Sequence, residues 1–374
     1  VVDTLETFIN RGRIIMQQDL KLESQTIYNQ GEIDVKQGAA NLIGHLHIHN
    51  KGTIGGAREL SLITQDMLEN VGRLVSGKSM ILKSKIFQHQ GVLAGEEEVT
   101  IVAKEQLTNK GIISANSLLS LNTQGRLENT AKLVSHQDII VRAKSFQHQD
   151  TLAAEGSVRI VATDQLTNGG NIKCKQEMEL QAGHLTNLGN IYSQASIQVK
   201  ETNTIANKGS LQTPGRLALT ASKIRNEGIL VSEANQMVLT AQEEVVNSNL
   251  MVGKAQIVIE TAGRVDNQGQ VISNKENLTI TAKELTNTGT LYGHLGQTLR
   301  MQELHNLQTI NTDSNLLLDT VKVTNQGILS ARQQLTIQAN SLDNTNEINS
   351  LRGDAQLLIN QEFINQKNAK VITE

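Results

Sequence analysis

The chain repeats itself about every twenty residues from one end to the other. Asparagine, replaced by histidine in two copies, recurs at intervals of 19, 20 or 21 residues. We call these positions the anchor column: 10, 29, 50, 70, 89, 109, 129, 148, 168, 187, 207, 226, 247, 267, 287, 306, 325, 344 and 365. Because they fill the sequence, we expect 1–374 to be one continuous repeat domain with no room for a second.

Apolar residues hold fixed places relative to the anchor column. The residue two before each anchor is apolar in every copy, and all four phenylalanines of the chain stand there. Further apolar residues follow at four, ten and twelve after the anchor, with other residues between them. A period of two is typical of β-strands, so we expect about three short strands, separated by turns, in each repeat unit or coil. Glycine, common two after the anchor, indicates one of the turns, because Asn and Gly tolerate positive φ.

A strand that returns to the same column in each coil must pair with its own equivalent, parallel and in register. We therefore predict an all-β fold, a right-handed parallel β-helix of about 19 coils of 19–21 residues, with its hand set by the crossover rule. Four phenylalanines, three tyrosines and no tryptophan suit a thin, regular core. The sole proline, Pro214, falls where a turn is expected, outside the central ladders.

The anchor asparagines are expected to point inward and to stack as a ladder of side-chain amides, as identical amides do in cross-β structures. His89 and His148 replace asparagine in this column, and an imidazole can still donate and accept hydrogen bonds. The structural residues that we assign to the ladder are Asn109, Asn129, Asn168, Asn187, Asn207, Asn226, Asn267 and Asn287.

Two segments resemble a known family. The run Leu-Thr-Asn-Lys-Gly-Ile-Ile-Ser-Ala at 107–115 and the run Val-Thr-Asn-Gln-Gly-Ile-Leu-Ser-Ala at 323–331 resemble the filamentous haemagglutinin repeat. The resemblance covers essentially the whole chain and implies a β-helical filament. It also implies a very large exoprotein of a Gram-negative bacterium, secreted or held at the cell surface by two-partner secretion, and a role as an adhesin, a haemolysin or a contact-dependent growth-inhibition effector in virulence or competition.

Neither end of the sequence resembles a capping coil, since 8–10 and 363–365 are ordinary repeat columns. We therefore expect a fragment of a longer solenoid. The family's secretion domain, with its Asn-Pro motif, is not expected within this chain, because no asparagine here precedes the proline. The outer-membrane transporter would then be contacted through a domain outside it.

Three histidines on one segment form the candidate metal site. His45, His47 and His49 alternate with Leu46 and Ile48, and with the leucine and isoleucine inward the imidazoles would line one outer face. Two of them could hold Zn²⁺ or Ni²⁺. The alternative is a solvated strand face, which we favour because no carboxylate follows at a ligand-like spacing.

The candidate binding motif is Arg352-Gly353-Asp354, where a turn is expected. It resembles the integrin-recognition tripeptide, although a chance occurrence is the simpler explanation. Cys174 is expected to be a small buried residue rather than a nucleophile. The acidic runs 96–98 and 243–244 are expected to be solvated charge.

Three functions compete. A rigid stalk that projects a functional tip is favoured, and the alternative is a segment that itself binds host or target-cell receptors. A β-helical carbohydrate-active enzyme is the third, but it would need paired carboxylates, aromatic platforms and long loops, so we expect no catalytic residue and no cofactor. A net charge of −3 with scattered basic residues predicts no nucleic-acid partner, and no apolar run is long enough to insert into a membrane.

Overall fold

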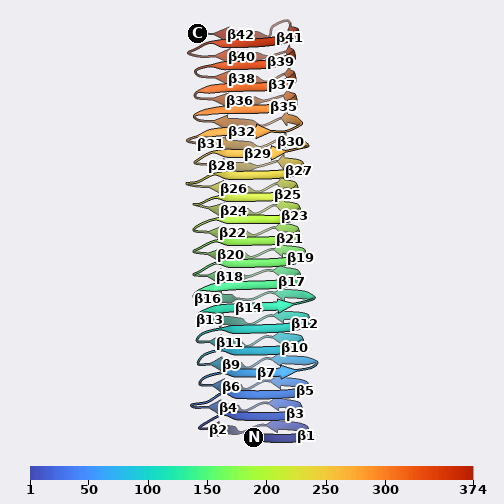
Figure 1. The fold of residues 1–374 in the computed structure, drawn as a ribbon, viewed down its shortest axis with the longest axis vertical. Coiled ribbons are helices and arrows are strands. Elements are labelled where there is room, and N and C mark those ends of the chain that lie inside the picture. The colour runs from blue at the N-terminus through green and yellow to red at the C-terminus, as the bar shows by residue number, and fades with distance from the viewer. Residues whose placement is uncertain (374) are drawn as a thin grey trace. The chain divides into compact units, whose positions relative to one another are not determined.

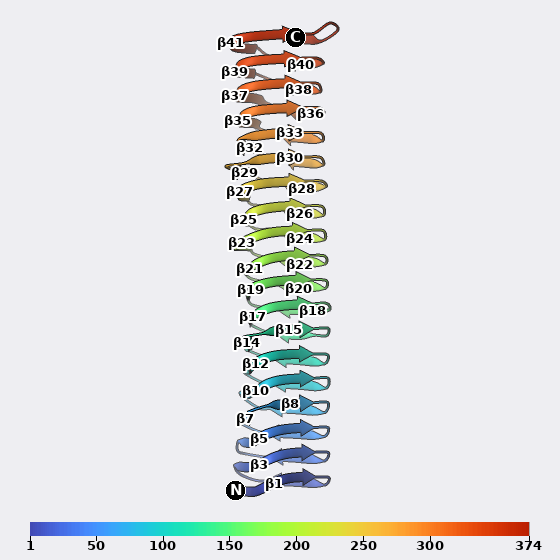
Figure 2. The same ribbon diagram turned by 90° about the vertical axis from the view of Figure 1, so that its right-hand side faces the viewer.

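The computed structural model describes residues 1–373, and every regular element in that range is a β-strand. The strands form two compact units, Val1–Gly183 and His184–Glu374. Within each unit parallel strands stack coil upon coil (Figure 1), and the turns that join them stack as well (Figure 2). The predicted all-β, parallel β-helix of about 19 coils is confirmed.

In the first unit each coil combines a long strand, in some coils divided in two, with a short strand. The long strands are β1 (Val2–Asn10), β3 (Leu20–Asn29), β5 (Ala40–Asn50), β7 (Leu60–Thr64) with β8 (Met67–Asn70), β10 (Met80–His89), β12 (Val99–Asn109), β14 (Leu118–Thr123) with β15 (Arg126–Asn129), β17 (Asp138–His148) and β19 (Val158–Asn168). The short strands are β2 (Arg13–Met16), β4 (Glu32–Val35), β6 (Thr53–Gly56), β9 (Arg73–Ser76), β11 (Val92–Gly95), β13 (Ile112–Ala115), β16 (Leu133–Ser135), β18 (Thr151–Ala154) and β20 (Asn171–Cys174).

The chain passes into the second unit within β21 (Met178–Asn187). The long strands that follow are β23 (Ile197–Asn207), β25 (Leu217–Asn226), β27 (Met237–Asn247), β29 (Ile257–Thr261) with β30 (Arg264–Asn267), β32 (Asn277–Thr281) with β33 (Glu284–Asn287), β35 (Gly296–Asn306), β37 (Asn315–Asn325), β39 (Leu335–Asn344) and β41 (Ala355–Asn365). The short strands are β22 (Asn190–Ser193), β24 (Ser210–Thr213), β26 (Ile229–Ser232), β28 (Leu250–Gly253), β31 (Gln270–Ser273), β34 (Thr290–Gly293), β36 (Thr309–Thr312), β38 (Ile328–Ala331), β40 (Glu347–Ser350) and β42 (Lys370–Thr373).

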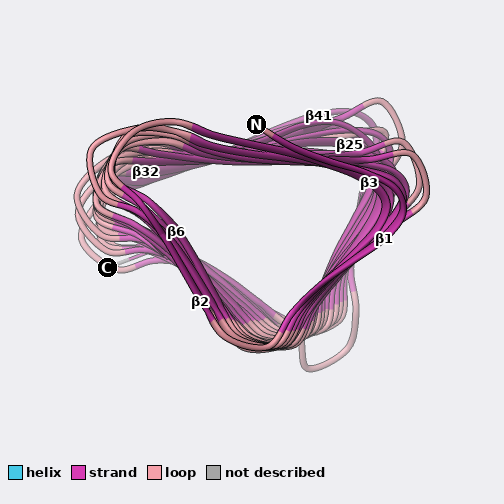
Figure 3. Ribbon diagram, turned by 90° about the horizontal axis from the view of Figure 1, so that it is seen from below, coloured by secondary structure: helices cyan, strands magenta, loops and turns pink. Residues whose placement is uncertain are grey.

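Each coil has a triangular outline, but most coils contain two strands rather than the predicted three (Figure 3). The long strand bends at a corner and so forms two faces of the triangle without ending. At this corner the pairing register shifts, for example between Ser84 and Ile86 of β10. The third turn expected from the sequence is therefore a bend within a continuous strand in most coils.

The core of each unit is built from the predicted apolar columns. In the first unit Phe87 and Leu107, two before their anchors, are fully buried and pair in register. Leu93 and Ile113, four after the anchors, are likewise fully buried and pair in register on the short strands. Each inward side chain is thus covered by its equivalents in the neighbouring coils, which explains why a coil depends on its neighbours for burial.

The Asn-x-Gly turn has a different cause from the one expected. Among residues 1–373 positive φ occurs only at Gly296 and Asn368, so the anchor turns do not need a left-handed residue. The turns instead stack so closely that a Cβ on Gly52 would overlap the carbonyl oxygen of Gly31. Glycine is required there by close backbone approach. Pro214 lies in the turn between β24 and β25, as predicted.

Candidate functional site

The anchor column lies inside the coils. All eight asparagines assigned to the ladder are at most 1% exposed. In the second unit Nδ2 of every anchor asparagine donates to Oδ1 of the next one, at 2.8–2.9 Å from Asn187 through to Asn365. Asn207 also approaches the main-chain carbonyls of Gly209 and Ile229 at 3.3 and 3.1 Å. Side chains and main chain are thereby joined into one network that satisfies these buried amides.

In the first unit the same ladder is divided by its two histidines. Nδ2 of Asn70 lies 3.0 Å from Nδ1 of His89, and Nδ2 of Asn129 lies 2.9 Å from Nδ1 of His148. The other ring nitrogen does not continue the ladder, because Nε2 of His89 faces the carbonyl oxygen of Ile112 at 3.1 Å. Oδ1 of Asn109 accepts instead from the amide of Gly111 at 3.2 Å. Each histidine is therefore the last member of a ladder.

The three outer histidines do not come together as a metal site. His45 lies 3.1 Å from a carboxylate oxygen of Glu23, and His49 lies 2.7 Å from one of Glu69. His47 is 3.9 Å from Asp66. The prediction missed these carboxylates, which come from the neighbouring coils. Among residues 1–373 no group of three or more His, Cys, Asp or Glu side chains is arranged to hold a metal ion.

Leu46, expected to point inward, is 49% exposed. That expectation was wrong because β5 turns its corner here, where the pairing skips from Gly44 to His47.

The tripeptide Arg352-Gly353-Asp354 lies in the bend between β40 and β41. The arginine and the aspartate are exposed, and the carbonyl oxygen of Asp354 accepts from the amide of Leu335 at 3.0 Å. The motif is thus accessible but its backbone is held against the neighbouring coil. Cys174 is 3% exposed, and its Sγ donates to the carbonyl oxygen of Gln176 at 3.1 Å, as suits a small buried residue.

Glu244 is a residue that the sequence interpretation placed wrongly. It was expected to be solvated, but its side chain is only 8% exposed and lies between two arginines of neighbouring coils. Arg225 donates to Oε1 at 2.7 Å and Arg264 to Oε2 at 3.0 Å. Hydrogen bonds from Arg225 are the largest cause that holds the pKa of Glu244 below its usual value. Counting three back from each anchor would have placed Glu244 beside Arg264 and Lys223.

A second cluster missed from the sequence lies on the outer face of β34. The Tyr292 hydroxyl donates to Oδ2 of Asp313 at 2.8 Å, and Nδ1 of His294 lies 3.2 Å from the same oxygen. Burial, followed by the bond to Asp313, raises the pKa of Tyr292 to about 12. The carboxylate comes from the next coil, 21 residues further along the chain. The sequence around Tyr292 therefore did not predict this contact.

Stacked coils with an internal amide ladder define the chain as a parallel β-solenoid protein. Its residues 4–55, 26–111, 106–170, 179–249, 258–319 and 304–367 match the haemagglutinin repeat model, so the chain belongs to the haemagglutinin repeat family. Proteins of this family are typically structural or adhesive, and they are generally secreted or surface-exposed. No curated protein and no solved structure matches the chain.

The part of the chain that the structure describes contains no helix with the length and apolar character needed to cross a membrane.

Proposed function

We propose that the chain is a rigid β-helical stalk segment of a large secreted or surface exoprotein, and that this protein projects an adhesive or toxic tip from a Gram-negative cell. The observation that carries the proposal is the uniformity of the coils. Among residues 1–373 no link between successive strands is longer than four residues, so no loop departs from the stack to build a groove or a lid. We propose further that 1–374 acts as a single uninterrupted repeat domain.

Contacts between coils support the stalk function. Ion pairs such as Lys175–Glu155 at 2.9 Å and Arg13–Glu32 at 2.7 Å join residues one coil apart. Buried Glu244 with the two arginines that bind it, Arg225 and Arg264, forms what we call the Glu244 clamp. This clamp joins three successive coils. Exposed pairs are individually worth only about 0–1 kcal/mol, but pairing across the coil interface favours the correct register at each step. Together with the amide ladder they oppose bending and slippage of one coil on the next.

The partners follow from this proposal. An outer-membrane two-partner-secretion transporter would export the protein through a domain outside this chain, and a receptor on a host or neighbouring bacterium would be bound by the tip. The haemagglutinin repeats support this assignment. Whether the tip is that of an adhesin, a haemolysin or a growth-inhibition effector depends on the sequence that flanks the repeat.

The alternative function is that the segment itself is adhesive. The exposed side chains of Arg352 and Asp354 favour it, because they are accessible to a receptor. The tight attachment of this bend to the coil beside it disfavours it, since the backbone at Asp354 cannot extend toward a partner without losing its bond to Leu335.

Binding of the purified chain to cells and to a glycan array separates the two functions. A stalk shows no saturable binding to integrin-bearing cells, to bacterial cells or to any glycan. Saturable binding that is lost in Asp354→Glu but kept in Asp343→Glu would replace the stalk function by the adhesive one. Turnover of a polysaccharide that depends on a carboxylate would contradict both.

A further inference from the structure

The structure fixes the protonation state of the two histidines in the anchor column. The Asn70 amide nitrogen only donates, so Nδ1 of His89 must be its acceptor and carry no proton. The Ile112 carbonyl oxygen only accepts, so Nε2 must carry the proton. His148 has the same arrangement, with Nδ2 of Asn129 at 2.9 Å from Nδ1 and the carbonyl oxygen of Asn171 at 3.3 Å from Nε2. Both rings are therefore neutral, with their single lone pair in use.

A proton on Nδ1 has no acceptor to face. It would point at the amide hydrogens of Asn70, and turning that amide over would bring its own nitrogen against Nδ2 of Asn50, which now donates to Oδ1 of Asn70 at 2.7 Å. The reversal would have to pass down the ladder through Asn29 to Asn10, whose links are both 2.8 Å. The ladder that ends at His148 contains only two asparagines, Asn109 and Asn129. At its other end the backbone amide of Gly111 donates to Oδ1 of Asn109.

The surroundings offer little compensation for a positive charge. Both imidazoles are 0% exposed. His89 is met by Asn70 on β8, Asn109 on β12 and the Ile112 carbonyl on β13, and none of these is charged. Phe87 stacks on its ring, with the ring centroids 6.1 Å apart.

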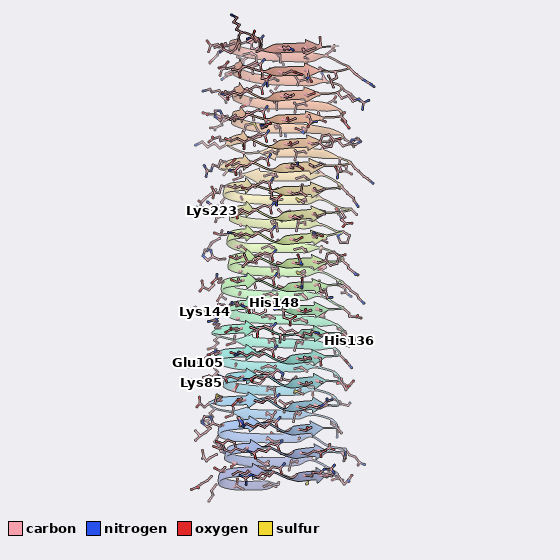
Figure 4. The ribbon with its side chains drawn as sticks, turned by 180° about the vertical axis from the view of Figure 1, so that it is seen from behind. Lys85, Glu105, His136, Lys144, His148 and Lys223 are labelled. Atoms are coloured by element: carbon pink, nitrogen blue, oxygen red, sulfur yellow. The ribbon has the colours of Figure 1, made fainter. Side chains whose placement is uncertain are left out.

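His148 has the ring of Phe146 at 5.9 Å, and Asp150 is the one charged group that favours its protonation. Burial lowers the pKa of both imidazoles. Figure 4 shows His148 among the strands, whereas Lys144 and His136 project at the edges.

We propose that His89 and His148 are an acid-sensitive switch in the first unit. A proton taken from solvent by Nδ1 of either ring breaks its bond to the preceding asparagine and opens the coil pairing at that histidine. The second unit, whose anchors are all asparagine, lacks this device and stays closed over the same range of pH. The repeated motif Phe-Gln-His-Gln at 87–90 and 146–149 is thus the signature of the switch.

Hydrogen–deuterium exchange on the full chain between pH 7.5 and 5 tests the proposal. Because each opened coil binds one more proton than the closed one, its opening constant, corrected for intrinsic exchange, should rise by roughly tenfold per pH unit below about pH 6.5. We expect this rise in peptides covering 67–95 and 126–154, and a flat response in peptides from 197–365. A flat response around both histidines would overturn the proposal.

The matched variant is His89→Asn with His148→Asn. It places at both positions the asparagine that all the remaining anchors have, and it should abolish the pH response. His136→Asn, at an exposed position, should leave the response unchanged. An unchanged pH response in the double variant would assign the opening to other groups and contradict the switch. Nitrogen NMR of the parent gives a second measure: a ring that titrates near pH 6.5 while its coil stays protected would also contradict it.

Discussion

The two units share one repeat but differ in its anchor column. In Val1–Gly183 two anchors are histidine, and each of them ends a short run of amides that begins at Asn10 or at Asn109. In His184–Glu374 every anchor is asparagine and the run is unbroken from Asn187 to Asn365. The acid-sensitive group there is Glu244, which lies outside the column. The residue type at the anchor thus sets how far the ladder extends, and under the proposed switch it also sets the response of each unit to acid.

Deletion of half a coil from the second unit should have the largest effect, and deletion of two whole coils is its control. Removing 207–246 joins Ala206 to Asn247, so that each strand meets a strand of the same column and the amide run closes again. The chain should stay soluble and rich in β-structure, because repeat energetics are local. Removing only 207–216 places turns against strands and should abolish folding, as measured by circular dichroism and size-exclusion chromatography.

The matching deletion in the first unit removes 89–128 and joins Gln88 to Asn129. It should fold equally well but lose one of the two acid-sensitive coils. Equal tolerance of the half-coil and two-coil deletions would show that the columns do not set the pairing.

Asn207→Leu should have the next largest effect. Leucine removes the acceptor of Asn187 and the donor to Asn226, whose ladder bonds are both 2.8 Å. Each buried amide left unpaired costs about 1–3 kcal/mol, so the free energy of unfolding in urea should fall by several times the loss seen for Asn203→Leu, at an exposed position of the same strand. If the two variants unfold at the same urea concentration, the ladder contributes nothing to stability.

Glu244→Gln tests the acid limit of the second unit. The carboxylate has a pKa below its ordinary value of 4.5, so its stabilisation is present above that value and is lost as the pH falls through the lower, folded pKa. The variant should lose about 1–2 kcal/mol at pH 7, a modest value because both arginines are more than half exposed. Its stability should then fall less than the parent's below pH 4.5. A parallel decline in both proteins would argue against the clamp.

Tyr292 should give the smallest effect, at the alkaline limit. Its pKa of about 12 lies above the ordinary value of 10, so its stabilisation is complete below pH 10 and is lost as the pH rises toward 12. In a Tyr28→Phe, Tyr192→Phe background, near-ultraviolet titration reports Tyr292 alone. Asp313→Asn should move the midpoint toward 10, since the carboxylate then no longer opposes the phenolate. No movement would mean that burial alone sets the pKa.

Much of the fold could be predicted because the repeat makes each column a long series of independent observations. Apolar residues such as Phe87 and Leu107 share a column, and in-phase columns require parallel pairing. The anchor column was also expected to point inward, and its asparagines are buried. Uniform coil length also argued against loops that build an active site.

What the sequence could not provide lies at the corner of the coil and in the direction of hydrogen bonds. At the corner the pairing skips a residue, so the alternation that placed Leu46 inward fails. Contacts between columns, such as Arg225 with Glu244, depend on side chains that lean along the stack. The end of the ladder at each histidine depends on which ring nitrogen faces a donor, and no column pattern records that.

The uniform direction of the amides gives the second unit two chemically different growing ends. A coil that joins on the carboxyl side always meets an amide NH₂, and one that joins on the amino side always meets an amide oxygen. Each link keeps the direction of the one before it, because an amide turned over within the ladder would set NH₂ against NH₂. The ladder is therefore polar along the stack, with a donor at its carboxyl end and an acceptor at its amino end.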